Sequence, residues 1–93
     1  MFRCMKSVLK PDDLTEIPGV GKSIADNLRK IGIRHVADLR GRYPERLYER
    51  SNRRVGAVQD RCLLYVFRLA VYYADTKPED RDPEKLRWWS WKD

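Results

Sequence analysis

The sequence predicts an all-α fold, with five short helices in a body over residues 11–74 and a short helical C-terminal tail. Apolar residues recur at the spacing of a helical face, a nearly continuous apolar run ends the body, and prolines and glycines separate the segments. Ninety-three residues can bury one modest core. We therefore expect a single domain over 1–93, comprising an N-terminal arm (1–10), the body and a Trp-rich tail (75–93).

The first predicted helix begins at Pro11, which suits the first turn of a helix, and ends near Ile17. Pro18 ends it because proline lacks a backbone donor and disfavours helical geometry in the residue before it. Two glycines then flank Val20, and glycine tolerates positive φ and lets another backbone or a ligand approach closely. The segment 17–21 is therefore expected to form a tight hairpin.

A second helix is predicted to leave this hairpin at Lys22. Gly32 suits the left-handed residue that closes such a helix. The apolar positions of its buried face are Ile24, Ala25, Leu28 and Ile31.

The start of this second helix is a candidate anion site. The first amides of a helix lack internal partners, the helix dipole places partial positive charge there, and the Lys22 side chain adds a full charge. Such a site would hold a nucleic-acid phosphate without reading the base sequence. The alternative is a hairpin that only joins two helices. The candidate phosphate-binding residues are Gly19, Val20, Gly21, Lys22 and Ser23.

This segment resembles the helix-hairpin-helix motif, which has an apolar residue, Pro-Gly, an apolar residue, Gly, and a small residue within the second helix. The resemblance implies contact with the DNA backbone through the hairpin amides. The matching positions are Ile17, Pro18, Gly19, Val20, Gly21 and Ala25.

A short third helix is predicted between Ile33 and Gly41, with His35 as its cap rather than as a catalytic or metal-binding group. A fourth helix should begin near Pro44 and reach about Arg53. Its apolar contributors are expected to be Tyr43, Leu47 and Tyr48.

Arginines form a one-sided row along this fourth helix and at its ends. The row could lie beside a phosphate backbone, or it could be a solvated face partly neutralised by Glu45 and Glu49. The candidate supporting contacts to DNA are Arg42, Arg46, Arg50, Arg53 and Arg54.

The last body helix is predicted from Gln59 to Ala74 after a break at 51–58. Its apolar run is too short to span a membrane, so we interpret it as the central buried helix. The resulting order of helix, hairpin, helix, connector, helix, turn and helix resembles a paired helix-hairpin-helix, or SAM-like, domain. The second turn lacks Pro-Gly and should be degenerate, with binding there limited to its arginines.

The tail should contain a final short helix with Asp82 as N-cap and Pro83 in its first turn. Its tryptophans could stack on unpaired bases or recruit a protein partner or a second copy of the chain. We favour packing, in which Leu86 and Trp89 contact tyrosines of the central helix. The tyrosines available for this contact are Tyr65, Tyr72 and Tyr73.

Charge favours a polyanionic partner. The chain carries 20 Lys and Arg against 14 Asp and Glu, a net charge of +6. Cys4 and Cys62 form no C-x-x-C pair, so we expect no metal and no cofactor. Unspaced cysteines and a start without an apolar export segment favour the cytoplasm, and we expect no membrane association.

Over nearly the whole chain from Leu9, the hairpin, the run DRCLLYVFRLAVYYA and the ending DPEKLRWWSWKD are similar to the small bacterial pathogenicity-locus family, some of whose members are labelled mitomycin-resistance-like. The resemblance implies a stand-alone helix-hairpin-helix protein. We therefore predict non-sequence-specific DNA binding, with a role in DNA repair or stress, and no enzymatic activity or catalytic residue. The alternative is a protein-interaction module, either a dimer or an adaptor, with a structural hairpin.

Overall fold

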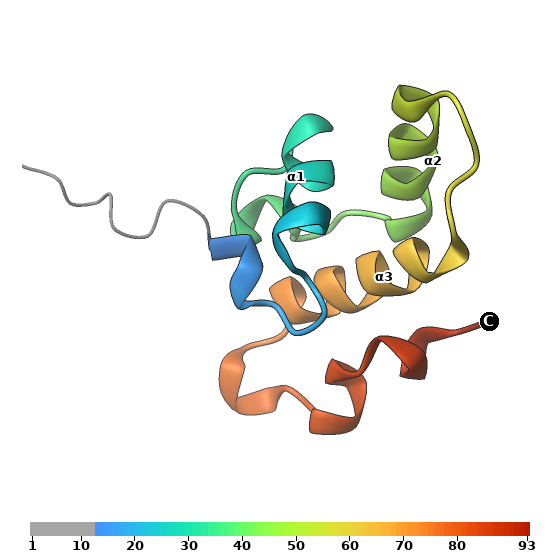
Figure 1. Cartoon of the computed structure of the whole chain (residues 1–93). Helices are drawn as coiled ribbons and strands as arrows, with labels where there is room; N and C mark the ends of the chain where they lie inside the picture. Colours follow the sequence, from blue (N-terminus) through green and yellow to red (C-terminus); the bar gives the residue numbers. More distant parts are fainter. Residues whose placement is uncertain (1–12) are drawn as a thin grey trace, which may run out of the picture.

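The computed structural model describes residues 13–93, and these residues form helices and turns without a β-strand (Figure 1). The all-α prediction is confirmed. Three segments are α-helices: α1 (Lys22–Lys30), α2 (Pro44–Val55) and α3 (Arg61–Asp75). The N-terminal arm, Cys4 and the predicted helix start at Pro11 lie outside the described residues.

Two of the five predicted body helices are single 3-10 turns, η2 (Asp13–Glu16) and η3 (Val36–Leu39). In η2 the Ile17 amide donates to the Leu14 carbonyl at 3.2 Å, and Pro18 then stops the helix. In η3 the amides of Arg34 and His35 both donate to the Asp38 carboxylate at 3.0 Å. His35 is the N-cap of η3, as predicted. The five-helix description is thus too regular for this chain.

Helix α3 runs through the middle of the molecule (Figure 1). The helices α1 and α2 lie on one side of it and the tail lies on the other. Each body element contributes a fully or almost fully buried side chain to the shared core: Leu14 of η2, Leu28 of α1, Leu39 of η3, Leu47 of α2 and Phe67 of α3. This placement confirms that the last body helix is central.

The tail forms three 3-10 turns, η4 (Pro78–Asp80), η5 (Pro83–Leu86) and η6 (Trp88–Trp91), in place of one final helix. Asp82 caps η5, and its carboxylate accepts from the Glu84 amide at 3.0 Å. The tail packs on α3 as predicted, but through Trp91 rather than Trp89. The ring centroids of Trp91 and Tyr72 are 5.5 Å apart, whereas Trp89 is 52% exposed.

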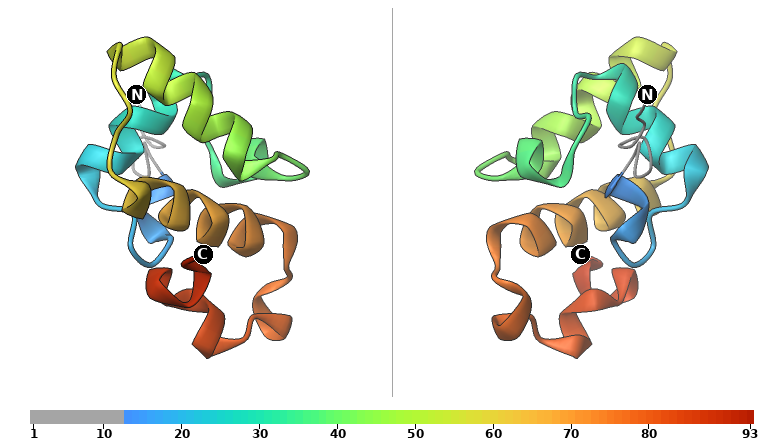
Figure 2. Two further views of the ribbon diagram at one scale, coloured as in Figure 1. Left: turned by 90° about the vertical axis from the view of Figure 1, so that its right-hand side faces the viewer. Right: turned by 90° about the vertical axis from the view of Figure 1, so that its left-hand side faces the viewer.

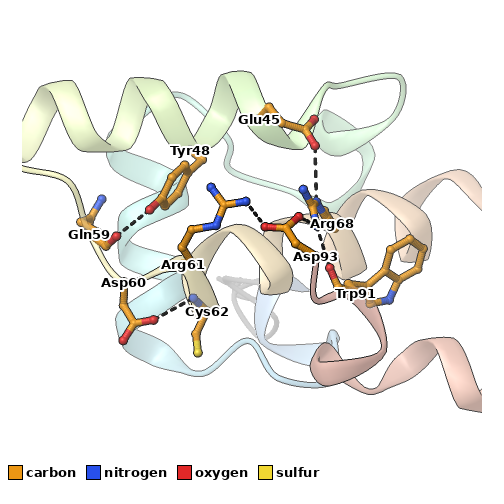
Figure 3. Close-up of polar contacts among 9 residues, drawn as sticks. All are labelled: Glu45, Tyr48, Gln59, Asp60, Arg61, Cys62, Arg68, Trp91 and Asp93. Carbon is orange, nitrogen blue, oxygen red and sulfur yellow. Dashed lines mark hydrogen bonds and ion pairs between the residues drawn. The ribbon is translucent and has the colours of Figure 1, made fainter.

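A polar network attaches the end of the tail to α3 and α2 (Figure 3). The guanidinium of Arg68 donates to the Trp91 carbonyl at 2.7 Å and pairs with Asp93 at 2.8 Å and with Glu45 at 3.3 Å. Arg61 also pairs with Asp93. Arg68, the one charge within the apolar run of α3, is thus the point where tail and body meet.

Candidate nucleic-acid interface

The turn before α1 has the geometry of a type II β-turn. The Val20 amide donates to the Ile17 carbonyl at 3.0 Å, and Pro18 and Gly19 occupy the two central positions. Gly19 has φ 87°, which an L-residue adopts only with strain. The side chains of Ile17 and Val20 are 1% and 4% exposed and anchor the turn in the core.

Helix α1 begins directly after this turn without a side-chain cap. Gly21 is its N-cap, and the first helical hydrogen bond runs from the Ala25 amide to the Gly21 carbonyl at 2.9 Å. Within residues 13–93, no group accepts a hydrogen bond from the amides of Gly19, Gly21, Lys22 or Ser23. These four residues are exposed, so their donors face solvent.

The Val20 amide is not part of this set, contrary to the expectation from the sequence. It is engaged in the β-turn, because the bend at Pro18 and Gly19 returns the chain toward the Ile17 carbonyl. Val20 therefore serves as a buried anchor.

Charge at the start of α1 is positive and unopposed. Its first turn contains no acidic residue, and Lys22 forms no ion pair with a described residue. The acidic side chain of the helix, Asp26, is one turn further on and pairs with Arg29. An anion at the free amides would therefore meet the helix dipole and the Lys22 ammonium together.

The start of α3 has a side-chain cap (Figure 3). The Asp60 carboxylate accepts from the Cys62 amide at 2.8 Å, and this backbone hydrogen bond lowers the pKa of Asp60. The preceding turn reverses at Gly56, whose φ is 81°. The start of α3 thus has a carboxylate at its N-cap and the Cys62 amide engaged, whereas the exposed amides of Asp60 and Arg61 have no acceptor within residues 13–93.

The predicted arginine row extends from the loop before α2 to the last turn of this helix, so its members do not all share one surface with the hairpin. Figure 2 shows the loop of residues 40–43, in green, projecting away from the turn at 17–21, in blue. Arg53 and Arg54 lie at the other end of α2, in its last turn. Arg42 lies in the projecting loop and therefore does not extend the hairpin surface.

Tyr43 is a surface feature that the sequence interpretation missed. The ring was assigned to the buried face of α2, but it is 68% exposed, whereas Leu47 and Tyr48 are 3% and 7% exposed. Tyr43 precedes Pro44 and has extended geometry, with φ −100° and ψ 115°, so it lies outside the helical repeat. The proline that follows Tyr43 in the sequence could have indicated that this residue lies outside the helix.

Comparison with known proteins identifies the family of this chain. A family model described as Cdd1, Pathogenicity locus, matches residues 8–93. The chain belongs to the pathogenicity-locus family. A relative in this group, the Mitomycin resistance protein McrB of Streptomyces lavendulae, is 42% identical over 66 residues. That match covers 71% of this chain and 63% of the McrB protein, so the chain corresponds to less than two thirds of its relative. No solved structure matches the chain.

The remaining candidate chemistry in this pathogenicity-locus protein is sparse. No three His, Cys, Asp or Glu side chains in the described part lie close enough together to hold a metal ion, including Glu79, Asp80, Asp82 and Glu84 of the tail. Cys62 is exposed, and its hydrogen bond with Asp60 raises the pKa of the thiol, which disfavours the nucleophilic thiolate. None of the described helices has both the length and the hydrophobicity needed to cross a membrane.

Proposed function

We propose that this pathogenicity-locus protein binds the DNA backbone without sequence preference and without catalysis. The donors are the amides of Gly19, Gly21, Lys22 and Ser23, and the Lys22 ammonium supplies the nearby charge. The observation that carries the proposal is the uncapped start of α1, where exposed amides have no acceptor within the described residues and no carboxylate stands in the first turn.

Phosphate fits this site better than other anions of macromolecules because several donors can share its oxygens. A base edge is not read by backbone amides at a turn, so affinity should be independent of sequence. Each contact of this kind contributes little, since helix-end charge interactions amount to about 0.3–1 kcal/mol when exposed. One module should therefore bind weakly.

Arg53 and Arg54 are the proposed supporting contacts. Both are exposed, and neither forms an ion pair with a described residue. Long arginine side chains can reach phosphates at a distance from the turn and hold them in two-point contacts. A role of this binding in DNA repair or stress is part of the proposal, and the name of the McrB relative is consistent with a protective role.

Fluorescence anisotropy with a short labelled duplex of arbitrary sequence tests the proposal. Lys22→Glu should abolish measurable binding, because it places a carboxylate beside the free amides. Lys30→Glu is the matched control: the same charge change at the exposed far end of α1 should reduce binding much less. Equal effects of the two variants would show that only net charge matters. If neither variant changes binding and sedimentation shows a stable dimer, the protein-interaction alternative is favoured.

A further inference from the structure

A second basic site lies on the side of the molecule away from the hairpin. A pocket of about 230 Å³ is lined by Gly41, Arg42, Tyr43, Arg46, Leu47 and Arg50. Three of the six lining residues are arginines, none is acidic, and the buried Leu47 side chain contributes apolar surface. The pocket differs from a solvated helix face because its cations border one concave space.

The backbone around this pocket is fixed by contacts with the end of α3. The Gly41 amide donates to the Asp75 carboxylate at 2.9 Å, and Arg40 Nε donates to the Ala74 carbonyl at 3.3 Å. The Arg42 amide also donates to the Leu39 carbonyl at 3.1 Å. Tyr43 is therefore exposed on a loop held at several points.

Two of the arginines are held in place while keeping free donors. Arg42 Nε donates to the Asp38 carbonyl at 3.0 Å, and Arg50 Nη1 donates to the Ile31 carbonyl at 3.2 Å. A guanidinium has five N–H donors, so each keeps others for a ligand. Within residues 13–93 no carboxylate forms an ion pair with Arg42, Arg46 or Arg50. The pocket thus offers guanidinium donors without an ion-pair partner, although Asp38 interacts electrostatically with Arg42 and Asp75 accepts from the Gly41 amide.

An aromatic ring stands beside this charge. The Tyr43 ring is about two-thirds exposed, and Arg46 Cζ lies 5.9 Å from its centroid. The pocket, at about 230 Å³, is smaller than the roughly 300–1,000 Å³ of pockets that enclose a whole organic ligand. A phosphate could occupy such a space while a flat group attached to it rests on the ring outside.

We propose that this pocket binds one unpaired nucleotide of a single strand, with its phosphate among the arginines and its base stacked on Tyr43. Base stacking on an exposed aromatic ring next to arginines is a general means of holding unpaired bases. A duplex keeps its bases inside the helix and cannot offer this contact. The inference rests on the proposed function in taking nucleic acid as the partner, but it uses different residues on a different side.

The test is anisotropy with labelled oligothymidine and, separately, a blunt duplex, for Tyr43→Ala and Tyr43→Phe. Tyr43→Ala should weaken oligothymidine binding about 5- to 150-fold, the range that stacking of one base represents. It should leave duplex binding unchanged. Tyr43→Phe keeps the ring and should bind like the native chain. The Tyr43 carbonyl accepts from Arg46 and Leu47 at the start of α2 and is kept in both variants, and the ring itself is exposed, so both variants should fold.

Competition experiments separate the phosphate from the nucleotide. Thymidine 5′-monophosphate should displace oligothymidine at lower concentration than inorganic phosphate does. Equal competition by the two, native-like binding by Tyr43→Ala, or equal loss in both Tyr43 variants would overturn the inference. If Lys22→Glu leaves duplex binding intact while Tyr43→Ala weakens oligothymidine binding, the hairpin proposal fails and this inference stands. A native chain that binds neither DNA contradicts both.

Discussion

The Asp60 carboxylate accepts a hydrogen bond from the Cys62 amide at 2.8 Å and thereby caps the start of α3. At the corresponding position of α1, Gly21 has no side chain, and the first amides face solvent. The two helices follow turns of similar role, yet only α3 has a carboxylate at its start, and that carboxylate disfavours an anion there. This difference is the structural basis for placing the phosphate site at α1.

Introducing a cap at α1 should close its site. Gly21→Asp is sterically permitted, because a Cβ at Gly21 meets no atom within 4 Å and the residue has extended geometry. An N-cap aspartate in place of glycine should raise stability by a few tenths of a kcal/mol. We expect duplex binding to be lost while the melting temperature is kept or raised. Ala37→Asp, which adds the same charge at an exposed position of η3, is the control and should retain most of the binding.

The β-turn before α1 should depend on glycine at position 19. Its φ of 87° makes Gly19→Ala strained, although the added Cβ would meet only Leu69 at an ordinary 3.9 Å. The strain should lower the free energy of unfolding by about 1–2 kcal/mol. Gly19→Asn should cost less because asparagine tolerates positive φ better. Urea denaturation measures both; equal stability of all three chains would contradict the assigned turn.

Packing of the tail should depend on Trp91 far more than on Trp89. The Trp91 ring packs against Tyr72 in a tilted arrangement, and its Nε1 donates to the Lys85 carbonyl at 2.8 Å. Because Trp91 is half-buried, Trp91→Ala should cost about 2–3 kcal/mol, less than the roughly 3–5 kcal/mol of a fully buried tryptophan. Trp89→Ala should change stability by no more than about 0.5 kcal/mol. A larger loss for Trp89 in thermal denaturation would argue against the observed packing.

The Asp93 contacts should make stability fall in acid. Hydrogen bonds from Arg61 and then Arg68 lower the pKa of Asp93, so its stabilising contribution is complete above the ordinary aspartate pKa of about 4 and is lost as the pH falls through the lower folded-state value. Asp93→Asn should therefore reduce the decline of melting temperature below about pH 4. Asp80→Asn removes a carboxylate without an ion pair to a described residue and should retain the native pH dependence.

Local chemistry explains which elements could be predicted. The bounds of α1 follow from residues adjacent in sequence: the turn glycines fix its start, and Gly32, with φ 97°, follows its end. Helix α3 was recognisable because its apolar run needs cover on every side. The lengths of η2 and η3 could not be predicted, because short segments have a marginal preference for helix and tertiary packing decides their form.

The candidate site was predictable in its residues but not in its layout. Helical spacing places Arg42, Arg46 and Arg50 near one another, but it does not show which side of the molecule that row faces. That side is set by packing, with Arg50 drawn to the Ile31 carbonyl and Arg42 to the Asp38 carbonyl. The engagement of the Val20 amide likewise depends on the φ and ψ angles of the turn, which composition alone leaves open.

The most direct test of the central claim is the salt dependence of duplex binding by the native chain and by Lys22→Glu. If the open start of α1 and its supporting arginines engage two to four phosphates, log affinity should fall against log salt concentration with a slope of about −2 to −4. Lys22→Glu should abolish that binding at low salt. Affinity that stays constant as salt rises, or Lys22→Glu binding indistinguishable from the native chain, would contradict phosphate binding at α1.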